Sequence, residues 1–405
     1  MPPLSQGGSG AAALHGALRA LLLFIALPLF AQSSDEISFQ RTFLLRNISG
    51  TSFNPGDTPH HPHIINRGAW TMFWGGALFA TYMSESGPDV QRNEGFSTNW
   101  IAAGAQRTLG SRGLVIFRGR ASLEPYTIKE RGYPQMLQWV STESGGPLLD
   151  SMRAHDAIGE AAIDLAFRTS TASFIHLYAA PIGDPALGAV PYAQRASSEE
   201  FAEAPFAYDV QETTHDSTRV ITAGFGSRFI TLEGSIFHDA VSHGRHTSFD
   251  SGGSIDSRSA RLTITPARNL ALQVSRGELG DAKREVSSAS LTYGNQNAAA
   301  SAIWTRGETL TSGTVEGTLR LSRSTMSARI EVVDRPIGFL GRPDIWRTTH
   351  FTVGYIFDLI KGAYRTGVGA NVDYQTQYRE LPARYGHKPQ TIYVFVRVRT
   401  DSRTR

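Results

Sequence analysis

The chain carries many charged side chains but lacks the residue patterns on which most catalysis depends. Cysteine is absent from its 405 residues, which excludes disulfides, thiol nucleophiles and zinc–thiolate sites. His215, Asp216 and Ser217 supply the residue types of a catalytic triad, yet neighbours on a strand point to opposite faces and cannot form that relay among themselves. GxSxG and HExxH spacings are both missing. We therefore predict no enzyme activity, no catalytic residue and no cofactor.

Charged residues recur instead on one face of segments in which polar and apolar residues alternate. Between residues 229 and 237, for example, Ile230 and Leu232 alternate with Thr231 and Glu233. The candidate pore-lining residues on such polar faces are Arg118, Arg120, Asp164, Arg168, Glu233, Arg261, Glu316, Arg320, Arg329, Glu331, Arg365 and Asp373. Rings of charged side chains set the ion preference of a pore, and an excess of arginine favours anions. The alternative is that these charges pair across strands and only brace a wall.

A second group of charges is concentrated in the stretch 181–216. Its carboxylates face a single Arg195, and four prolines stiffen the backbone. The candidate constriction residues are Asp184, Glu199, Glu200, Glu203, Asp209 and Glu212. The arrangement resembles, in plan only, the long acidic loop that folds into the barrel of trimeric general porins, where opposed potentials narrow the pore. The alternative is an acidic loop exposed to solvent outside the barrel.

Histidine gives the third candidate chemistry. His60, His61 and His63 stand together near the start of the chain, and neutral imidazole is a common ligand of copper, zinc and nickel. Other histidines fall near the long loops: His155, His215, His238, His243, His246, His350 and His387. Neither CxxC nor HExxH spacing supports a metal site, so this is a weak prediction beside that of a polar linker.

The elements that would position these groups are short strands joined by alternating tight and long connections. The expected strands are 70–82, 95–108, 113–122, 158–168, 172–180, 217–226, 229–238, 256–265, 269–276, 285–294, 298–306, 313–322, 325–333, 346–358, 362–375 and 390–399. Seven connections are tight and eight are longer, beginning and ending with a long one. This pattern predicts an all-β, transmembrane antiparallel barrel of about 16 strands with short periplasmic turns and long extracellular loops. The competing fold is a secreted, soluble β-sandwich or β-propeller.

The start of the chain predicts export. An apolar run of about 11 residues, Ala20–Phe30, follows Arg19 and ends near the small residue Ala31, which is typical of a secretory signal peptide. We expect cleavage after Ala31, with Ser33 as the alternative. The chain then divides into a signal peptide (1–31), a flexible periplasmic segment (32–69), the outer-membrane barrel (70–400) and a charged tail (401–405). A net charge of only +3 argues against nucleic acid as a partner.

Several segments resemble a family of uncharacterised bacterial secreted or outer-membrane β-barrel proteins. The segments that carry the resemblance are Gly50–Pro55, Trp70–Met72, Phe96–Trp100, Leu123–Pro125, Ala180–Gly188, His215–Thr218 and Arg261–Asn269. The resemblance strengthens the prediction of a barrel but implies no substrate and no catalytic residue. The last strand, 391–399, resembles the signal that the outer-membrane assembly machinery reads, although a charged tail follows it.

Together these features predict a Gram-negative outer-membrane protein of the porin type. A barrel of 16 strands has room for an aqueous channel, so we expect transport of small hydrophilic solutes with a modest anion preference. The expected partners are outer-membrane lipid, the barrel assembly machinery and these solutes, and the sequence leaves a homo-oligomer open. The alternatives are a plugged barrel with a structural or receptor role, a copper- or zinc-binding protein and, least favoured, a hydrolase with its site at the barrel rim.

Overall fold

The computed structural model describes residues 50–59, 62–87, 91–129, 132–141, 147–152, 154–215, 217–227, 229–239, 253–336, 345–377, 385–386 and 389–401. All of them belong to one compact unit, residues 37–405. The expected signal peptide, most of the charged tail, His60, His61 and the rim residues His243, His246 and His387 lie outside the described residues.

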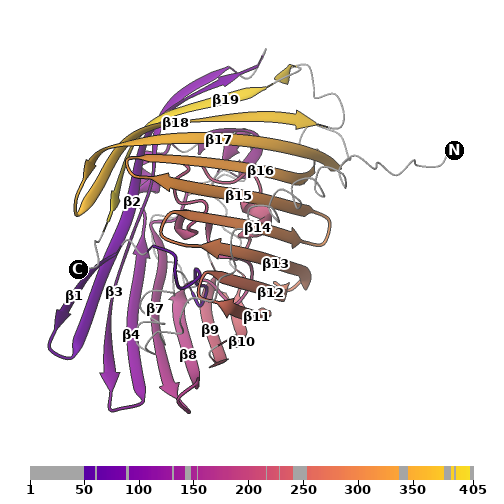
Figure 1. Ribbon diagram of the computed structural model, residues 1–405. Coiled ribbons are helices and arrows are strands. Elements are labelled where there is room, and N and C mark those ends of the chain that lie inside the picture. Colours follow the sequence, from indigo (N-terminus) through magenta and orange to yellow (C-terminus); the bar gives the residue numbers. More distant parts are fainter. Residues whose placement is uncertain are drawn as a thin grey trace. The chain divides into compact units, whose positions relative to one another are not determined.

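Sixteen antiparallel strands in this part of the chain form a closed β-barrel (Figure 1). They are β2 (Trp70–Ser86), β3 (Arg92–Leu109), β4 (Gly113–Ala121), β7 (Ile158–Arg168), β8 (Ser173–Ile182), β9 (Thr218–Ser227), β10 (Ile230–His238), β11 (Ser257–Ala267), β12 (Leu270–Leu279), β13 (Arg284–Gly294), β14 (Ala298–Arg306), β15 (Thr311–Leu321), β16 (Ser324–Pro336), β17 (Ile345–Lys361), β18 (Tyr364–Gln377) and β19 (Gln390–Thr400). Each pairs with its neighbours in chain order, and β19 pairs with β2 to close the ring.

The predicted barrel of 16 strands is therefore confirmed. Each expected strand corresponds to one observed strand, and many observed strands extend a few residues further, as β2 does to Ser86 and β17 to Lys361. The reason is that polar residues at strand ends keep the ladder hydrogen bonds while breaking the apolar alternation.

Three strands were not predicted. β1 (His63–Arg67) pairs with Trp70–Trp74 of β2, just beyond the stretch Ala77–Ser86 that pairs with β19. β1 thus covers the part of the β2 edge that β19 leaves open, which matters because an unpaired strand edge invites association. The other two, β5 (Tyr133–Ser141) and β6 (Pro147–Met152), form a separate hairpin within the long connection between β4 and β7.

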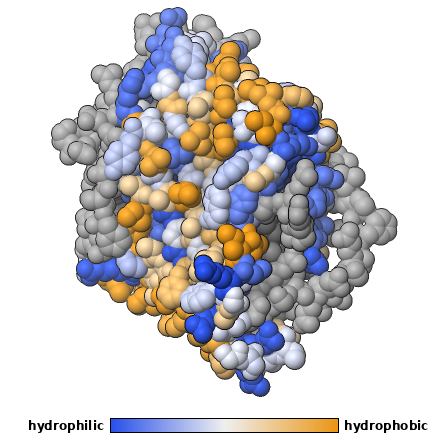
Figure 2. Space-filling view, turned by 90° about the vertical axis from the view of Figure 1, so that its left-hand side faces the viewer, coloured by the Kyte–Doolittle hydropathy of each residue, from blue (hydrophilic) through white to orange (hydrophobic). Residues whose placement is uncertain are grey.

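The outward side chains of the barrel are apolar and exposed. Val353 is 60 % exposed, Leu232 56 % and Val394 54 %, and all three alternate with buried neighbours, such as Thr231 and Glu233 on either side of Leu232. Figure 2 shows apolar side chains spread over a wide part of one face of the molecule. Such a surface is expected where strands face lipid rather than water. Among the described residues, no helix is long and apolar enough to cross a membrane.

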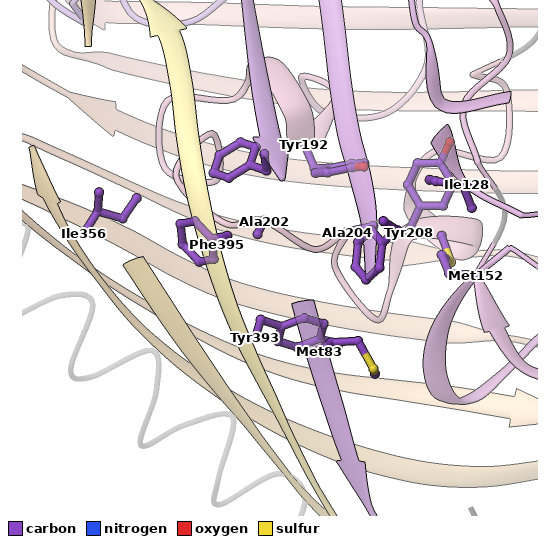
Figure 3. Packing of buried hydrophobic residues seen from close by; sticks show 12 residues of the cluster. Met83, Ile128, Met152, Tyr192, Ala202, Ala204, Tyr208, Ile356, Tyr393 and Phe395 are labelled. Carbon is purple, nitrogen blue, oxygen red and sulfur yellow. The ribbon is translucent and has the colours of Figure 1, made fainter. Parts of the chain in front are cut away.

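The inside of the barrel is packed rather than open. Short helical turns lie in the connections: α3 (Glu124–Thr127), η1 (Tyr192–Gln194) and α4 (Tyr208–Gln211). A cluster of buried side chains joins the β8–β9 connection to the wall, with Tyr192, Ala202 and Tyr208 packed near Phe395 of β19 and Met83 of β2 (Figure 3). The largest core of this barrel is therefore made between the wall and a loop.

Candidate functional site

The connection between β8 and β9, residues 183–217, folds back into the lumen and is called the inner loop here. Ser197, Ser198 and Glu200 have no measurable exposure to solvent. The hydroxyl of Ser197 lies 2.7 Å from that of Ser301 on β14, and Arg329 of β16 donates to the Ser198 hydroxyl at 2.5 Å. These strands lie far along the barrel from β8 and β9, so the inner loop crosses the lumen.

Ion pairs hold the middle of the inner loop against the wall. Glu199 accepts from Arg320 at 2.7 Å and from Arg399 at 3.2 Å. Glu200 pairs with Arg397 and, at 3.0 Å, with Arg399. In the opposite sense, Arg195 of the loop donates to the wall carboxylate of Glu316 at 2.6 Å.

Glu316 is the centre of a buried three-charge group. Its second oxygen accepts from Arg329 at 3.0 Å, so one carboxylate serves two guanidinium groups. The Arg329 guanidinium also lies 4.0 Å from the ring centre of Phe201 in the inner loop. Buried charges are tolerated only when they are paired and hydrogen-bonded, and this group meets that condition through residues of both the wall and the loop.

Backbone contacts fix the next part of the inner loop. The amides of Phe206 and Ala207 both donate to the Glu331 carboxylate at 2.9 Å. Arg335 donates to the Phe206 carbonyl and pairs with Asp209 at 2.5 Å. The apolar side of this stretch packs against the β5–β6 hairpin through Met136, Leu137 and Val210. The hairpin therefore covers the inner loop at the end of the barrel where the long connections lie.

Two carboxylates of the inner loop are fully buried without a short ion pair to any of the described residues. Burial raises the pKa of Glu203 to about 7, although its carboxylate accepts from Asn371 at 2.7 Å. Burial also raises the pKa of Glu212 to about 7, and this carboxylate accepts from the Tyr192 amide at 2.6 Å. Both groups therefore change charge near neutral pH, inside the lumen.

A second segment enters the lumen, residues 50–58, called the lumen segment here. Thr51 accepts from Arg261 at 2.5 Å, and the Gly50 amide donates to Glu160 at 3.0 Å. The side chain of Asn54 donates to the carbonyl of Gln194 at 3.0 Å and accepts from the amide of Ala196 at 3.3 Å. The lumen segment thus supports the inner loop by pairing with its backbone.

These residues belong to the range 32–69, for which the sequence predicts a flexible periplasmic segment. Residues 50–58 are mostly buried in the lumen, and His63–Arg67 is the strand β1. The physical reason is that a lumen lined with charges supplies partners for the polar backbone of a Gly/Ser/Asn-rich segment. The alternation of polar and apolar residues in the sequence does not reveal hydrogen bonds between this segment and the lumen.

The candidate pore-lining residues all lie on inward positions of the wall. The buried ones are Arg118, Arg120, Asp164, Glu233, Arg261, Glu316, Arg320, Arg329, Glu331 and Asp373, whereas Arg168 and Arg365 are partly buried. The candidate constriction residues Asp184, Glu199, Glu200, Glu203, Asp209 and Glu212 lie on the inner loop, within the lumen rather than outside it. The structure brings wall residues and inner-loop residues together as ion pairs. Other wall charges pair across neighbouring strands, as Arg261 does with Glu233 and Arg329 with Glu316.

Of the three candidate metal ligands His60, His61 and His63, the structure describes His63. His63 packs against aromatic rings, 4.6 Å from Trp74 and 5.6 Å from Tyr364. No group of three or more histidine or acidic residues in this part of the chain is arranged to hold a metal ion. Of the other histidines near the long loops, His155 and His215 do approach each other, with ring centres 5.1 Å apart.

Sequence reasoning missed Arg335, Asn54 and Glu160 as lumen residues. Arg335 lies beyond the expected end of its strand at 333, and Glu160 stands close to a strand start, where alternation is weakest. The Asn-Pro pair at 54–55 signals a turn, but nothing in the sequence says which part of the molecule this turn contacts. Only the fold supplies that information.

A small pocket remains between the wall and the inner loop. It is lined by Trp100, Arg120 and His155 from the wall and its connections, and by Pro191, Gln194 and His215 from the inner loop. Arg120 reaches across this gap, donating to Gln194 at 3.2 Å and pairing with Asp184 at 3.4 Å.

Comparison with solved structures places the fold among the outer-membrane porins. Salmonella typhi OmpF, solved in complex with daunomycin, matches with a TM-score of 0.52 at 8 % identity, covering 83 % of this chain and 100 % of the other. An anion-selective porin from Comamonas acidovorans matches at 0.49 and 10 % identity, over 82 % of this chain and 99 % of the other. OmpT, an outer membrane protein of Vibrio cholerae, matches at 0.46 and 7 % identity, over 83 % and 100 %. The fold is that of a porin.

Sequence comparison adds nothing to this. No protein-family model matches the chain, and no curated protein matches it. At 8 % identity to OmpF the likeness concerns the fold alone, so the function is argued from the lumen itself.

Proposed function

We propose that this protein is an outer-membrane channel for small hydrophilic solutes whose lumen is closed by the inner loop. The observation that carries the proposal is the set of ion pairs between the wall and the inner loop, above all those of Glu199 and Glu200 with three wall arginines. Sixteen strands enclose more space than wall side chains fill, and here the inner loop and the lumen segment occupy it.

The nature of the contact supports a displaceable closure. Water can replace an ion pair or a serine hydroxyl contact at small net cost, because the separated groups become hydrated. The Arg320–Glu199 pair and the contact of Ser197 with Ser301 are of this kind. A loop held only by apolar packing would expose that surface to water on opening, which costs about 25 cal/mol for each Å².

The same contacts support a preference for anions. Arg320, Arg397 and Arg399 are neutralised by the inner loop in the closed arrangement. When the loop moves away, Arg320 and Arg399 face the lumen without Glu199 and Glu200, while Arg397 keeps its wall partner Asp358. Rings of charged side chains attract ions of the opposite sign, so the open lumen would favour anions.

Planar-bilayer conductance tests the proposal. We expect the wild-type protein to show rare, small conductance steps, and the double variant Glu199→Gln plus Glu200→Gln to open often, with a reversal potential shifted toward that of the anion. Arg276→Gln plus Glu285→Gln is the matched control, because it removes an exposed pair at 2.7 Å outside the lumen. It should leave conductance unchanged.

A plugged barrel with a structural or receptor role is the second candidate. It is favoured by the apolar cluster of Met136, Leu137, Phe206 and Val210, which joins the β5–β6 hairpin to the inner loop and would resist displacement. Silent bilayers from both the wild-type protein and the double variant, each shown to be folded by heat-modifiability, would favour this candidate over the channel.

A further inference from the structure

We propose that the outward face of β1, β2 and β3, at the end of the barrel where the tight turns lie, binds the headgroup of an anionic phospholipid of the phosphatidylglycerol type. The residues that would contact the phosphate are Arg67 and Arg107, with Trp70 between them. The sequence predicts that this end is periplasmic, so the lipid would belong to the inner leaflet of the outer membrane. The proposal rests on the barrel and its apolar outer surface, and it is independent of conduction.

The register of the strands places these three side chains in one row. Arg67 of β1 is paired directly with Trp70 of β2, and Trp70 is paired directly with Arg107 of β3, on strands that lie side by side (Figure 1). Directly opposite residues of antiparallel strands point to the same face of the sheet. That face is the outward one, because Ile65 and Ile101, on the same faces of β1 and β3, are 51 % and 52 % exposed. Two arginine side chains therefore flank one indole on the outer surface.

The charges of this row are free to meet a ligand. Arg67 and Arg107 are both exposed, and neither pairs with a carboxylate among the described residues. The guanidinium carbon of Arg107 lies 5.6 Å from the ring centre of Trp70. A ring face attracts the guanidinium without using its N–H groups as a carboxylate does. The row thus holds a positioned cation whose donors can bind a phosphate.

Outward arginines near the long connections have a different environment. Arg258 pairs with Glu278 at 2.8 Å, and Arg276 pairs with Glu285 at 2.7 Å. These side chains are exposed as well, but a carboxylate on the neighbouring strand balances each charge. The row on β1, β2 and β3 has no such balance within the part of the chain that the structure describes. Its charge is therefore complementary to an anion.

Apolar surface borders the row on the side of the membrane. Two positions further along each strand, the register aligns a second outward row: Ile65, Met72, Ala105 and Phe117. The ring centres of Phe117 and Trp70 are 6.2 Å apart, so the two rows are in contact. A lipid can place its phosphate at the arginines and its acyl chains on the apolar row, as is usual where aromatic residues mark the membrane boundary. A free anion would use the arginines alone, and this favours a lipid as the ligand.

The charge of the headgroup decides between lipid classes. Phosphatidylethanolamine carries a phosphate and an ammonium group, and the ammonium would lie near two guanidinium groups of the same sign. Phosphatidylglycerol carries the phosphate without that cation. A basic side chain near a membrane surface strengthens binding to anionic lipid by about fivefold. For two arginines we expect a preference for phosphatidylglycerol of at least about tenfold.

Native mass spectrometry of the detergent-solubilised protein tests this proposal, with equimolar dimyristoyl phosphatidylglycerol and dimyristoyl phosphatidylethanolamine as the probes. The wild-type protein should retain phosphatidylglycerol with the expected preference. Arg67→Gln plus Arg107→Gln should bring the two occupancies close to equality. Arg258→Gln plus Arg276→Gln is the matched control, because it removes two outward positive charges at the other end of the barrel. It should leave the preference unchanged.

Two further measurements separate lipid binding from other causes. Arg67→Lys plus Arg107→Lys keeps both charges and should retain part of the preference, and heat-modifiability shows that each variant is folded. Glycerophosphoglycerol, the headgroup without acyl chains, should compete poorly, because it cannot use the apolar row.

Equal occupancy by the two lipids in the wild type, or a preference that survives in the Arg67/Arg107 glutamine variant, would overturn the proposal. So would competition by glycerophosphoglycerol equal to that by the intact lipid, which would show a site for a free anion. Higher occupancy by lipopolysaccharide than by phosphatidylglycerol would assign the row to the other leaflet and overturn it too. A silent bilayer bears on the channel and leaves these measurements intact.

Discussion

The inner loop is held in two different ways along its length. Its middle, residues 195–200, lies against β14, β15, β16 and β19 through short, largely buried ion pairs and a serine hydroxyl contact. Its two ends meet at the pocket, where Arg120–Asp184 and His215–Asp184 lie at 3.4 and 3.6 Å. The middle is thus held by buried charges of the wall, whereas His155 and Glu212, whose pKa values are raised, lie at or beside the pocket end. Under the proposed function, the middle serves as the closure and the pocket end contributes groups that respond to pH.

Removing the charge of Glu316 should have the largest effect, because this carboxylate joins the middle of the inner loop to the wall. Glu316→Gln leaves Arg195 and Arg329 buried without their carboxylate, and breaking such a group costs roughly 3–5 kcal/mol of the free energy of unfolding. Denaturant unfolding of the detergent-solubilised protein would measure it. Glu285→Gln breaks an exposed pair and should cost no more than about 1 kcal/mol. Similar losses in the two variants would contradict the view that the Glu316 charge group anchors the middle of the inner loop to the wall.

The lumen segment can be tested through its first described residue. Gly50 has φ +53°, and a side chain there would collide with the backbone carbonyl of Asp184. Gly68 has φ +60° but open space around it, so Gly68→Ala measures the cost of the backbone conformation alone, about 1 kcal/mol. Gly50→Ala should cost about 2 kcal/mol more because the lumen segment must move. Equal unfolding midpoints for the two variants would mean that the segment is not tightly packed.

Asn54→Ala should have an intermediate effect. It removes two hydrogen bonds and leaves the Gln194 carbonyl and the Ala196 amide without the Asn54 side chain. An unsatisfied buried polar group costs about 1–3 kcal/mol. Loss of these contacts should also increase proteolysis of the inner loop relative to wild type, which mass spectrometry of limited digests can follow. Protection equal to that of the wild type would show that the inner loop needs no support from residue 54.

The smallest expected effect is that of pH on how firmly the inner loop is held in the lumen. Glu203 and Glu212 have pKa values raised to about 7, and that of His155 is raised above its usual value. A group whose pKa is higher in the folded state than in the unfolded state binds more protons when the protein is folded. Its contribution to stability is therefore complete below the pKa of the unfolded state and is lost as pH rises through the pKa of the folded state.

Open probability in bilayers should therefore increase from pH 6 to pH 8, and Glu203→Gln plus Glu212→Gln should flatten this dependence. The Glu199→Gln plus Glu200→Gln variant is the control, since it should raise open probability at every pH while keeping the slope. A pH dependence that survives in the Glu203/Glu212 variant would place the responsive groups elsewhere.

The sequence by itself determined the wall. In a strand, every second side chain lies on the same face. Arg118, Glu233 and Glu316 could therefore be assigned to the polar face of their strands from the sequence alone. Tight turns and long loops fixed the strand order, and the fold follows because antiparallel neighbours in sequence are neighbours in the barrel. The density of carboxylates in 181–216 also predicted, as one of two alternatives, that this loop folds into the lumen.

Only the tertiary structure decided what fills the lumen and which charges meet. The pairing of Glu200 with Arg397 joins residues 197 positions apart, and that of Asn54 with Ala196 joins residues 142 apart. Such contacts have no local pattern, because their energy comes from burial and hydrogen bonding between parts that folding brings together. The pocket has the same origin: Arg120, His155 and His215 are ordinary polar residues in sequence, and the crossing of the inner loop makes them neighbours.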